Sequence, residues 1–539
     1  MPAAQIEFAT ATDGTATVIV NGTAIHSRYH PIREAQRLVA GQLRESVPET
    51  VILFEPGLGY AAAAIRQSLP NARILAITFE SAIAERAMPL LRECGAEVWS
   101  SDGVSLDRFL ERHIDDLHLA SLAVVDPSVA ARCFPEAHRE RSEVLRDVLA
   151  RQKASVATTA GFGRRWLRNA VDNTLRIERV TPLPTVQRPL VVAASGPSLE
   201  EVARPLAGLR RHFELWALPS ALRALAAAGL EPDLVVATDP GYYATAHFFR
   251  QRVARVAMPL SAAPLPSRAQ PAVSLFAEGH GFEHDLLAVL GIDLPVVTPA
   301  GTVATTAIKL AERCGARWIL LAGLDLCYRD LLAHARPSLS AELLEERARR
   351  TRPYPTQLLA HAMDHAPERV AVGGSVIRRG PALDAYASWF DRVAKSAATV
   401  ARLLPSPIST GGLRELEPAA LEGALHAAVS AADRVAAPKR DIQRGRALTW
   451  PSQHARVAAV GGLLADWARQ IAAAGRVPTA PDQLRGTAVW HLAHYCETAE
   501  LLRSRTALRR GEEWVRTWRK ALQGCQRLVD NLDARVRAA

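Results

Sequence analysis

Long apolar stretches are missing from this chain of 539 residues. No apolar run reaches the roughly 18–20 residues that a membrane-spanning helix needs. The first residues, MPAAQIEFATATDG, contain no basic segment followed by an apolar one, which is how a secretory signal begins. A hydrophobic content of 49% is nevertheless typical of a globular protein with sizeable cores. We therefore expect a cytoplasmic protein without a membrane span.

Cysteine is scarce and scattered. The chain has six cysteines, and none of them forms a CxxC pair: Cys94, Cys133, Cys314, Cys327, Cys496 and Cys525. Neither a zinc site nor a disulfide framework is indicated, so we expect reduced thiols and no metal. The Walker A, GxSxG and protein-kinase signatures are absent as well.

Positive charge is unevenly placed along the chain. The formal net charge is +10, and residues 431–539 contain 19 Lys and Arg against 10 Asp and Glu. An acidic partner, a nucleotide or a membrane surface could exploit this excess. Because no dense basic run occurs, solvated helical faces are the favoured interpretation, and we expect no nucleic-acid partner.

Alternating strands and helices predict parallel, doubly wound sheets in two parts of the chain. A β-rich start with an Asn21-Gly22 turn leads to a helix at 32–43 and to strands expected at 51–54, 73–78, 97–99 and 120–125. Helical sequence from Pro135 to about Ile177 then leads to strands expected at 189–194, 214–218, 233–238, 253–258 and 318–322.

Helical sequence dominates from about Glu415 to the end, with five tryptophans as packing anchors: Trp450, Trp467, Trp490, Trp514 and Trp518. The pattern predicts an α/β protein with two Rossmann-like parallel-sheet domains followed by an α-helical C-terminal domain. We expect these three domains at 1–150, 151–415 and 416–539.

The first candidate site is a buried strand that enters a tight turn. Residues 189–194 run into Ser195-Gly196-Pro197-Ser198-Leu199, where glycine permits a close backbone approach. Ser198 can cap the following helix, and Glu201 would complete a capping box. Free N–H groups and the positive dipole end of that helix suit a phosphate. We expect a nucleotide-phosphate cradle here, and a well-capped βα turn without a ligand is the alternative.

Three further turns follow strands or open helices of the same predicted unit. Asp239-Pro240 ends one strand, Gly301-Thr302 opens a helix, and Asp325 follows the strand at 318–322. Four polar or glycine-rich turns on one predicted sheet edge indicate a ligand site more strongly than any single turn does. The two carboxylates could hold a hydroxyl, a base edge or a metal, whereas a strand-ending turn or helix–sheet packing is the alternative.

A histidine nine residues past Asp325 is the candidate general base. His334 is this residue, and the near-neutral pKa of an ordinary imidazole suits the deprotonation of an acceptor hydroxyl. A packing histidine is the alternative. Four other histidines are rivals with weaker context: His280, His284, His361 and His365. The last two have helical i, i+4 spacing but lack the glutamate of HExxH, which argues against zinc.

A partial dinucleotide fingerprint occurs in the first α/β unit. Glu55-Pro56-Gly57-Leu58-Gly59 has two glycines rather than three, and a proline inside the turn. No acidic residue follows cleanly at the expected distance, since Glu80 itself ends a strand. We expect a Rossmann-like unit without bound NAD.

Taken together, these segments resemble the motility-associated factor (Maf) family of flagellin glycosyltransferases, which carry a domain related to the 6-hydroxymethylpterin diphosphokinase MptE. His26-Ser27-Arg28-Tyr29-His30-Pro31 with Glu34-Ala35 is similar to the family's N-terminal H-S-x-Y-x-P-x-x-E-A segment. The resemblance continues, in order, through the following segments: Trp166-Leu167-Arg168-Asn169 with Asn173, Ser195 to Leu199, Pro232-Asp233, Asp239-Pro240, Gly323-Leu324-Asp325-Leu326, His334-Ala335 and Gly411-Gly412.

The central segment also resembles bacterial sialyltransferases that carry a G-N-G-P-S-L turn. That resemblance implies a Rossmann-type sheet, a CMP-sugar donor, inverting transfer and no required metal. Ser195 stands where those enzymes have Asn, and Asp239 stands where they have an Asn-Pro. Thr298 to Val303 resembles their T-S-G-x-Y stretch without its Tyr.

The two resemblances together imply a glycosyltransferase that moves a pseudaminic- or legionaminic-type nonulosonic acid from a CMP-sugar to Ser or Thr of flagellin. Nucleotide-sugar binding is implied for the following residues: Ser195, Gly196, Pro197, Ser198, Asp239, Pro240, Gly301, Thr302 and Asp325. His334 would be the catalytic base, and no cofactor would be tightly bound. The alternatives are an ATP-dependent pterin diphosphokinase-like transferase and a non-catalytic flagellar scaffold, and the oligomeric state is left open.

Overall fold

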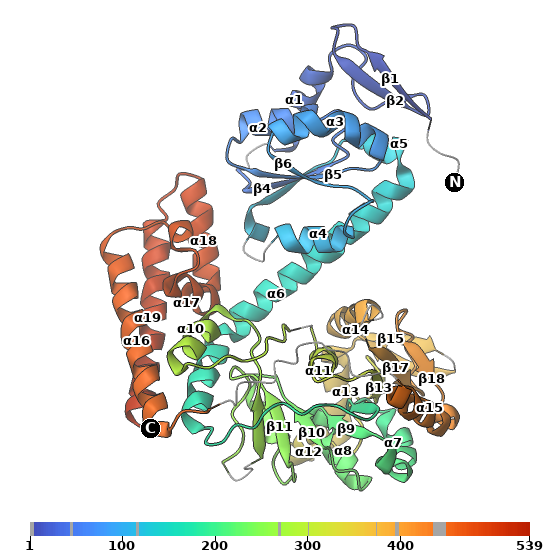
Figure 1. Cartoon of the computed structure of the whole chain (residues 1–539), viewed down its shortest axis with the longest axis vertical. Helices are drawn as coiled ribbons and strands as arrows, with labels where there is room; N and C mark the ends of the chain where they lie inside the picture. The colour runs from blue at the N-terminus through green and yellow to red at the C-terminus, as the bar shows by residue number, and fades with distance from the viewer. Residues whose placement is uncertain are drawn as a thin grey trace. The chain divides into compact units, whose positions relative to one another are not determined.

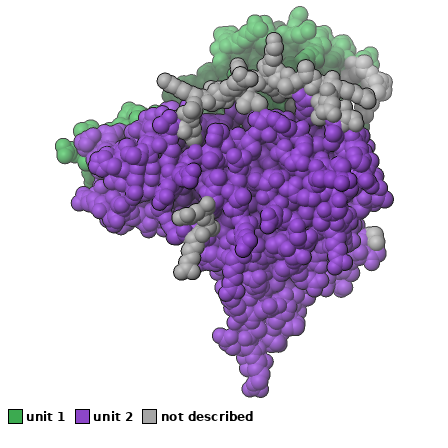
Figure 2. All heavy atoms as spheres, turned by 60° about the horizontal axis from the view of Figure 1, so that its bottom comes forward, with its two compact units in different colours: residues 1–163, 471–525 green, residues 164–470, 526–539 purple. Residues whose placement is uncertain are grey.

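The structure is a computed structural model that describes residues 5–43, 47–114, 118–267, 271–299, 301–372, 374–393, 398–434 and 449–539. The chain groups into two compact units, which Figure 2 colours separately. Unit 1 comprises residues 1–163 and 471–525, and unit 2 comprises residues 164–470 and 526–539.

Three helices contain the boundaries between the units: α6 (Pro135–Arg176), α16 (Gln453–Arg476) and α19 (Val515–Arg537). The bounds of α6 confirm the long helix expected from Pro135. The expected division into domains at 1–150, 151–415 and 416–539 stays a prediction, and the C-terminal helices are shared between the two units.

Unit 1 begins with a small antiparallel sheet of β1 (Ile6–Thr10), β2 (Ala16–Val20) and β3 (Thr23–Ala24). Asn21 and Gly22 have φ values of 47° and 80°, which is the left-handed conformation that a tight hairpin needs. The β-rich start is therefore confirmed. Helix α1 (Pro31–Gln42) follows and buries Ala35 and Val39, which are one helical turn apart.

A four-stranded parallel sheet with the order β6-β5-β4-β7 forms the main part of unit 1 (Figure 1). Its strands are β4 (Thr50–Phe54), β5 (Arg73–Ile77), β6 (Ala96–Trp99) and β7 (Leu122–Val125), as the alternating pattern predicts. The helices between and after them are α2 (Tyr60–Ser68), α3 (Ser81–Glu93), α4 (Leu106–His113) and α5 (Ser128–Cys133).

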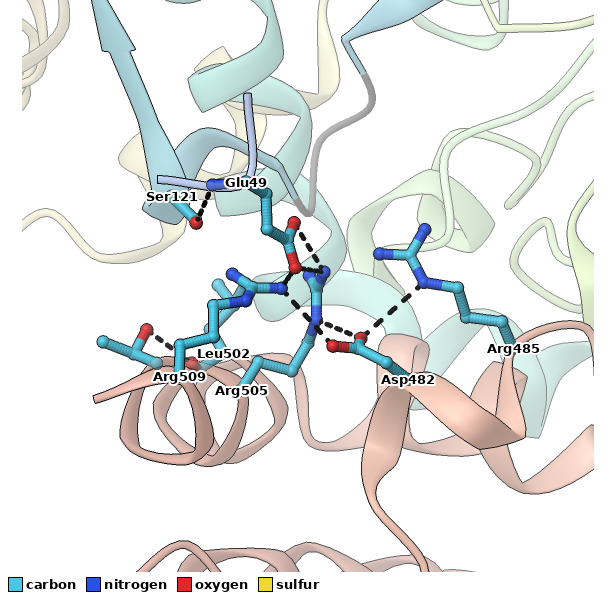
Figure 3. A network of polar contacts seen from close by, with 8 residues as sticks. Glu49, Ser121, Asp482, Arg485, Leu502, Arg505 and Arg509 are labelled. Atoms are coloured by element: carbon cyan, nitrogen blue, oxygen red, sulfur yellow. Dashed lines mark hydrogen bonds and ion pairs between the residues drawn. The ribbon is translucent and has the colours of Figure 1, made fainter. Parts of the chain in front are cut away.

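A partly buried ion-pair network joins helix α18 (Thr498–Arg509) to the amino edge of this sheet, within unit 1. Figure 3 shows Arg505 and Arg509 pointing toward Glu49, which immediately precedes β4. Arg505 donates to both carboxylate oxygens of Glu49 at 2.9 and 3.0 Å, and through Nε to Asp482 at 2.7 Å. Arg509 also pairs with Glu49. Because Arg505 is only 1% exposed, removal of a carboxylate would leave its charge buried and poorly compensated.

The larger sheet lies in unit 2 and has eight parallel strands in the order β12-β11-β10-β9-β8-β13-β17-β18. Five of them confirm expected strands: β8 (Leu190–Ala193), β9 (Glu214–Ala217), β10 (Leu234–Val236), β11 (Arg255–Met258) and β13 (Trp318–Ala322). Three were not expected: β12 (Ala272–Leu275), β17 (Thr399–Leu403) and β18 (Arg414–Leu416). The two parallel sheets and the helical C-terminal region confirm the predicted α/β fold class.

The strand order places a topological switch point between β8 and β13. From β8 the chain proceeds strand by strand to β12, and it then returns to place β13 on the opposite side of β8. Val191 of β8 consequently pairs with Leu215 of β9 on one side and Leu320 of β13 on the other. In open α/β sheets, ligands bind at the carboxyl ends of the strands at such a point.

Helices cover the large sheet, as Figure 1 shows for α7, α8 and α11. The helices of unit 2 around the sheet are α7 (Leu199–Gly208), α8 (Leu222–Ala227), α9 (Tyr242–Ala246), α10 (Gly281–Leu290), α11 (Val303–Arg313), α12 (Leu339–Glu346), α13 (Tyr354–His365) and α14 (Pro381–Val393). A small antiparallel sheet of β14 (Tyr328–Arg329), β16 (Ser375–Arg379) and β15 (Glu368–Val372) follows β13.

The C-terminal region is helical, as expected. Its helices are α15 (Leu421–Arg434), α16, α17 (Ala488–Cys496), α18 and α19. Trp467 and Trp518 are each 1% exposed and Trp490 is buried, so these three act as packing anchors. In the part of the chain that the structure describes, no helix is both long and apolar enough to cross a membrane.

Candidate functional site at the switch point of the large sheet

The turns that follow β8 and β13 are bonded directly to each other. The Ala194 amide donates to the Ala322 carbonyl at 2.8 Å, and the Gly196 amide donates to the Gly323 carbonyl at 2.7 Å. This parallel pairing continues past the ends of the strands. It holds the predicted phosphate turn against the turn that carries Asp325.

Glycine is required in both turns because their backbones are so close. A Cβ atom on Gly196 would lie 2.6 Å from the Gly323 oxygen and 2.7 Å from Cγ of Asp325. A Cβ atom on Gly323 would lie 2.6 Å from the Ala194 oxygen, and Gly323 has a φ of +69°. No larger side chain fits either position without a shift of backbone. The close backbone approach predicted at Gly196 is therefore made by the neighbouring turn of the same chain.

Asp325 is the acceptor for the amide at the start of helix α7. The Ser198 amide donates to Oδ2 of Asp325 at 2.7 Å, and the Ser198 hydroxyl donates to Oδ1. Burial raises the pKa of the Asp325 carboxyl, while the two bonds from Ser198 and the charges of Arg329 and Arg402 act in the opposite direction. A carboxylate is stabilised at a helix N-terminus for the same reason that a phosphate is.

The predicted capping box at this helix is wrong. The Ser198 side chain makes no cap to α7, because its hydroxyl is bonded to Asp325. Glu201 forms an ion pair with Arg329 instead of turning back to the Ser198 amide. Neighbouring Glu200 accepts the Arg336 amide at 2.8 Å and pairs with its guanidinium. The amide expected to face a phosphate is thus already bonded within the chain, whereas binding of a nucleotide sugar by residues 195–198 stays a prediction.

His334 lies against the first residue of the same turn. Its Nδ1 is 2.9 Å from Oγ of Ser195, and the neighbouring Ala335 amide donates to the Ser195 carbonyl at 2.8 Å. Burial, and then the nearby His361, lower the pKa of His334, although a hydrogen bond with the Ser195 backbone raises it. Burial lowers the pKa of His247 to about 4, and the charge of His334 contributes to this shift. His334 is thus a histidine with a lowered pKa that lies directly against the turn.

Asp239 and Pro240 lie elsewhere on the edge, after β10. Two strand spacings separate β10 from β8, and three separate it from β13, which is about 14 Å at 4.8 Å per strand. Asp239 is exposed, and its Oδ1 accepts the Gly241 amide at 2.6 Å. The idea that Asp239 and Asp325 serve one metal ion is not supported, because their strands are far apart and Asp325 is bonded to Ser198.

Two asparagines of α6 hold the loops at this part of the edge. Asn169 donates to the carbonyls of Pro240 and Ser261, each at 3.1 Å. Asn173 donates to the carbonyls of Leu260 and Ala262, each at 2.8 Å. Both asparagines are buried, so their amides stabilise loops that would otherwise contain unpaired carbonyls.

Gly301 and Thr302 form the start of α11. The Thr302 hydroxyl accepts the Thr305 amide at 3.1 Å, which is a helix cap of the ordinary kind. Gly301 has a φ of +82°, and any Cβ there would collide with the indole of Trp389. The predicted close approach at this turn is therefore made to Trp389. A ligand contact at these two residues stays a prediction.

Part of unit 2 matches a known protein family. A family model described as "6-hydroxymethylpterin diphosphokinase MptE-like" matches residues 164–331. These residues form an MptE-like domain. The domain contains the two turns at the switch point as well as Asp239, and its match ends three residues before His334.

Two related proteins have sequence identities of about 30% with parts of this chain. An uncharacterized protein of Treponema pallidum (strain Nichols) is 30% identical over 288 residues, which cover 53% of this chain and 60% of that protein. A second uncharacterized protein of the same organism is 29% identical over 121 residues, covering 22% of this chain and 58% of that protein. The chain thus spans less than two thirds of the length of these two relatives.

A solved structure, described as that of a Maf glycosyltransferase from Magnetospirillum magneticum AMB-1, matches almost the whole chain. The TM-score is 0.55 at 12% identity, and the match covers 99% of this chain and 92% of that one. At this identity the likeness shows the fold. The fold that the sequence resemblance implied is confirmed by this match.

A buried polar cluster in the MptE-like domain was missed by the sequence analysis. The Ser261 hydroxyl donates to Oε2 of Glu278 at 2.6 Å, and His280 pairs with the same carboxylate at 3.3 Å. Glu283 accepts the amides of residues 278, 279 and 280 at 2.9 to 3.1 Å. Trp166 stacks on the His280 ring with centroids 4.7 Å apart. Burial would lower the pKa of His280, but the two carboxylates raise it above its usual value.

The glycine turn of unit 1 is also filled by side chains of the chain itself. Glu55 accepts the Gly57 amide at 3.2 Å and the Phe79 amide at 2.7 Å, while Nε2 of His26 accepts the Leu58 amide at 2.8 Å. Residues 55–59 are all buried. Burial raises the pKa of Glu55 to about 7. The expected Rossmann-like turn is present, and its amides are occupied.

A metal centre of ordinary composition is not found among the residues that the structure describes: no group of three or more His, Cys, Asp or Glu side chains is placed to hold an ion. His361 and His365 lie with ring centroids 4.3 Å apart. Their mutual repulsion contributes to the lowered pKa of His361, after burial.

Proposed function

We propose that this protein is a cytoplasmic glycosyltransferase that moves a pseudaminic- or legionaminic-type nonulosonic acid from a CMP-sugar to Ser or Thr hydroxyls of flagellin. The observation that carries the proposal is that His334 lies against the turn after β8, beside the switch point between β8 and β13. Ligands of open α/β sheets bind at this position. The fold shared with a Maf glycosyltransferase gives independent support for a transferase.

The chemistry needs one base and a stabilised leaving group. The acceptor oxygen attacks the anomeric carbon, its proton passes to a ring nitrogen of His334, and the bond from that carbon to the phosphate oxygen breaks. CMP leaves as an anion, so positive charge assists it more than a strong acid would. Arg329 and Arg336 lie beside the first turn of α7, each paired with a glutamate. Their charges make the surroundings of that turn less negative.

Direct displacement with inversion is the stereochemical course that we propose. A retaining enzyme of the two-step kind uses a carboxylate nucleophile that the substrate can reach. Asp325, the carboxylate that is bonded to Ser198 of the turn, is buried and accepts two hydrogen bonds from that residue. A neutral histidine base acting on the incoming hydroxyl supports inversion instead.

The transfer reaction itself tests the proposal. Purified flagellin would be incubated with the protein and CMP-pseudaminic acid, and the added mass would be measured by intact-protein mass spectrometry. His334→Asn should reduce the transfer rate by about 10²–10⁴-fold, which is the usual contribution of a general base. His454→Asn is the matched control, because His454 is an exposed histidine of α16 and is not a candidate base. Equal rates for the two variants would remove His334 from the mechanism.

Ligand binding tests the donor class separately. We expect CMP and CMP-sugars to raise the melting temperature, and Asp239→Ala to abolish that shift. A retained shift in this variant would show that Asp239 lies outside the donor site. If no nucleotide changes the melting temperature but flagellin binds, a flagellar scaffold is the better description.

An ATP-dependent pterin diphosphokinase-like transferase is the second candidate, because the family model that matches residues 164–331 carries that description. Such a reaction uses Mg²⁺ to bridge phosphates, and one or two carboxylates hold the ion. A melting shift with ATP, Mg²⁺ and a pterin, in the absence of any shift with CMP, would favour this candidate over the first.

A further inference from the structure

We propose that Ser195 is a positioning residue for His334: it fixes the Nδ1 side of the ring, so that Nε2 is the atom that accepts the proton. The inference deepens the proposed function and rests on it for the identity of the reaction. It gives Ser195 a role other than donor binding, which the resemblance to sialyltransferases implied.

The first observation is that three successive residues around His334 are bonded to the β8 turn or to the first turn of α7. Oγ of Ser195 lies 2.9 Å from Nδ1 of His334, and the Ala335 amide donates to the Ser195 carbonyl at 2.8 Å. The Arg336 amide then donates to Glu200 of α7 at 2.8 Å. The backbone that carries the histidine therefore cannot move independently of the turn.

The second observation concerns the two ring nitrogens. The Ser195 backbone lies close enough to the ring to raise the pKa of His334, although burial lowers that pKa more strongly. The 2.9 Å contact between Oγ of Ser195 and Nδ1 fits either tautomer, and the proposal assigns the hydrogen to Nδ1, which then donates to Oγ and leaves the lone pair of the neutral ring on Nε2. Nε2 has no protein partner among the described residues, and it is not one of the fully buried nitrogens without one. Under the proposal, its lone pair is therefore the one that takes the proton of the substrate hydroxyl.

The third observation is that the surroundings keep the ring neutral. Burial and the charge of His361 on α13 lower the pKa of His334, and His247 at the end of α9 is close enough for the two rings to influence each other. A base must be unprotonated before it can act, and these neighbours ensure that at pH 7. In this proposal Ser195 determines which nitrogen is the base, while burial and the nearby His361 lower the pKa of the ring.

The geometry also explains why a serine suits this position. Residue 195 is buried, and its side chain must reach a ring nitrogen from a turn whose next residue is held against Gly323. A hydroxyl on a single carbon makes that contact at 2.9 Å. Alanine would leave Nδ1 without its side-chain partner, whereas threonine would retain the oxygen.

The first experiment needs no substrate. The protein would be labelled with ¹⁵N-histidine, and long-range ¹H–¹⁵N spectra would report the tautomer of His334, which His334→Asn identifies by loss of its signals. In the wild type we expect Nδ1 to be protonated and Nε2 to be unprotonated. Ser195→Ala should give a mixture of the two tautomers, and Ser195→Thr should restore the single one. A single, unchanged tautomer in Ser195→Ala would overturn the inference.

The second experiment measures transfer from CMP-pseudaminic acid to flagellin with the same variants. Ser195→Ala should lower kcat by about 10–100-fold and leave the KM for the donor within about twofold, because a base in the wrong tautomer still lets substrate bind. Ser195→Thr should recover most of kcat. An increase in KM with normal kcat would make Ser195 a donor-binding residue, and a sugar adduct on Ser195 detected by mass spectrometry would make it a nucleophile. Either result would overturn the inference.

The two experiments separate the inference from the proposed function. If the tautomer responds to Ser195→Ala but no CMP-sugar is consumed, the positioning role stands and the proposed reaction falls. If sugar is transferred but the tautomer and kcat of Ser195→Ala match the wild type, the reaction stands and the positioning role falls. Circular dichroism melting of each variant would verify that the fold is retained.

Discussion

Replacement of Asp325 by alanine should strongly destabilise unit 2, because this one side chain satisfies two buried donors. The Ser198 amide and hydroxyl both donate to the carboxylate, and Ser198 is fully buried. A buried donor left without a partner costs about 1–3 kcal/mol. Two such donors predict a loss of about 2–6 kcal/mol in the free energy of unfolding, which is a large part of the stability of a typical domain.

Asparagine at the same position offers a sharper test. Asp325→Asn retains an acceptor for the Ser198 amide and should cost less than the alanine variant. Since burial raises the pKa of Asp325 in the folded state, the carboxyl favours folding at pH values below its unfolded pKa, and this contribution is lost as the pH rises through the folded pKa. The asparagine variant has no such dependence. Its stability relative to the wild type should therefore improve from pH 4.5 to pH 8.

Urea unfolding followed by tryptophan fluorescence would measure both effects, with hydrogen exchange of peptides spanning residues 190–203 to assign the transition to unit 2. Asp293→Ala is the control, because Asp293 is exposed and should change stability by less than about 0.5 kcal/mol. A loss below about 1 kcal/mol for Asp325→Ala would refute the claim that this carboxylate holds the turn.

Three further predictions concern residues that hold the turns and loops next to the strands of each sheet. Gly196→Ala should cost about 2 kcal/mol or more, measured by urea unfolding, since its Cβ would overlap backbone of the neighbouring turn, while Gly208→Ala, with open space around it, should be tolerated. Asn173→Ala removes two buried hydrogen bonds and should lower the unfolding free energy by about 2–4 kcal/mol; a thermal melt within 1 °C of the wild type would contradict this. Burial raises the pKa of Glu55 to about 7 in the folded protein, so the stability that this group contributes is lost as the pH rises from about 4.5 through 7. The stability of Glu55→Gln relative to the wild type should therefore increase between pH 5.5 and pH 8. If the urea midpoints of the two proteins change in parallel with pH, this prediction is wrong.

Local sequence patterns were sufficient to predict the elements that carry the site. Strands β8 and β13 are apolar runs that end in glycine-containing turns, and both lie where the pattern predicts them. Their common edge therefore followed from the sequence. What local sequence does not contain is the partner of each turn residue. Ser198 and Asp325 are 127 positions apart, and Ser195 and His334 are 139 apart.

The capping box was predicted wrongly for that reason. Ser198 and Glu201 have the right spacing for a reciprocal cap, but the buried Asp325 competes for the same hydroxyl and Arg329 competes for the glutamate. A charged acceptor bonds a hydroxyl or an amide more strongly than a neutral one does. Long-range electrostatics therefore outweighed a local motif whose two contacts are each worth about 1 kcal/mol.

The missed elements contain polar residues at positions that are buried. Strand β17 reads Thr-Val-Ala-Arg-Leu, and Arg402 interrupts its apolar pattern although its side chain is 0% exposed and pairs with Glu415 of β18 at 2.5 Å. Glu278 is also buried, because its carboxylate accepts the Ser261 hydroxyl and pairs with His280. Buried charges of this kind are rare, so a sequence pattern assigns such residues to the surface.

Turns whose amides are bonded within the chain have a consequence for assigning function from sequence. In both sheets a strand runs into a glycine turn of the shape that nucleotide-binding proteins use, and in both the amides are taken by the chain: by Glu55 and His26 in one, by Asp325 in the other. A search by glycine spacing alone therefore does not distinguish a turn whose amides are bonded within the chain from one whose amides face a ligand. A useful filter would ask whether a buried acid or imidazole elsewhere in the chain can reach the turn. Conversely, loss of that internal group during evolution would uncover an anion site that the backbone already shapes.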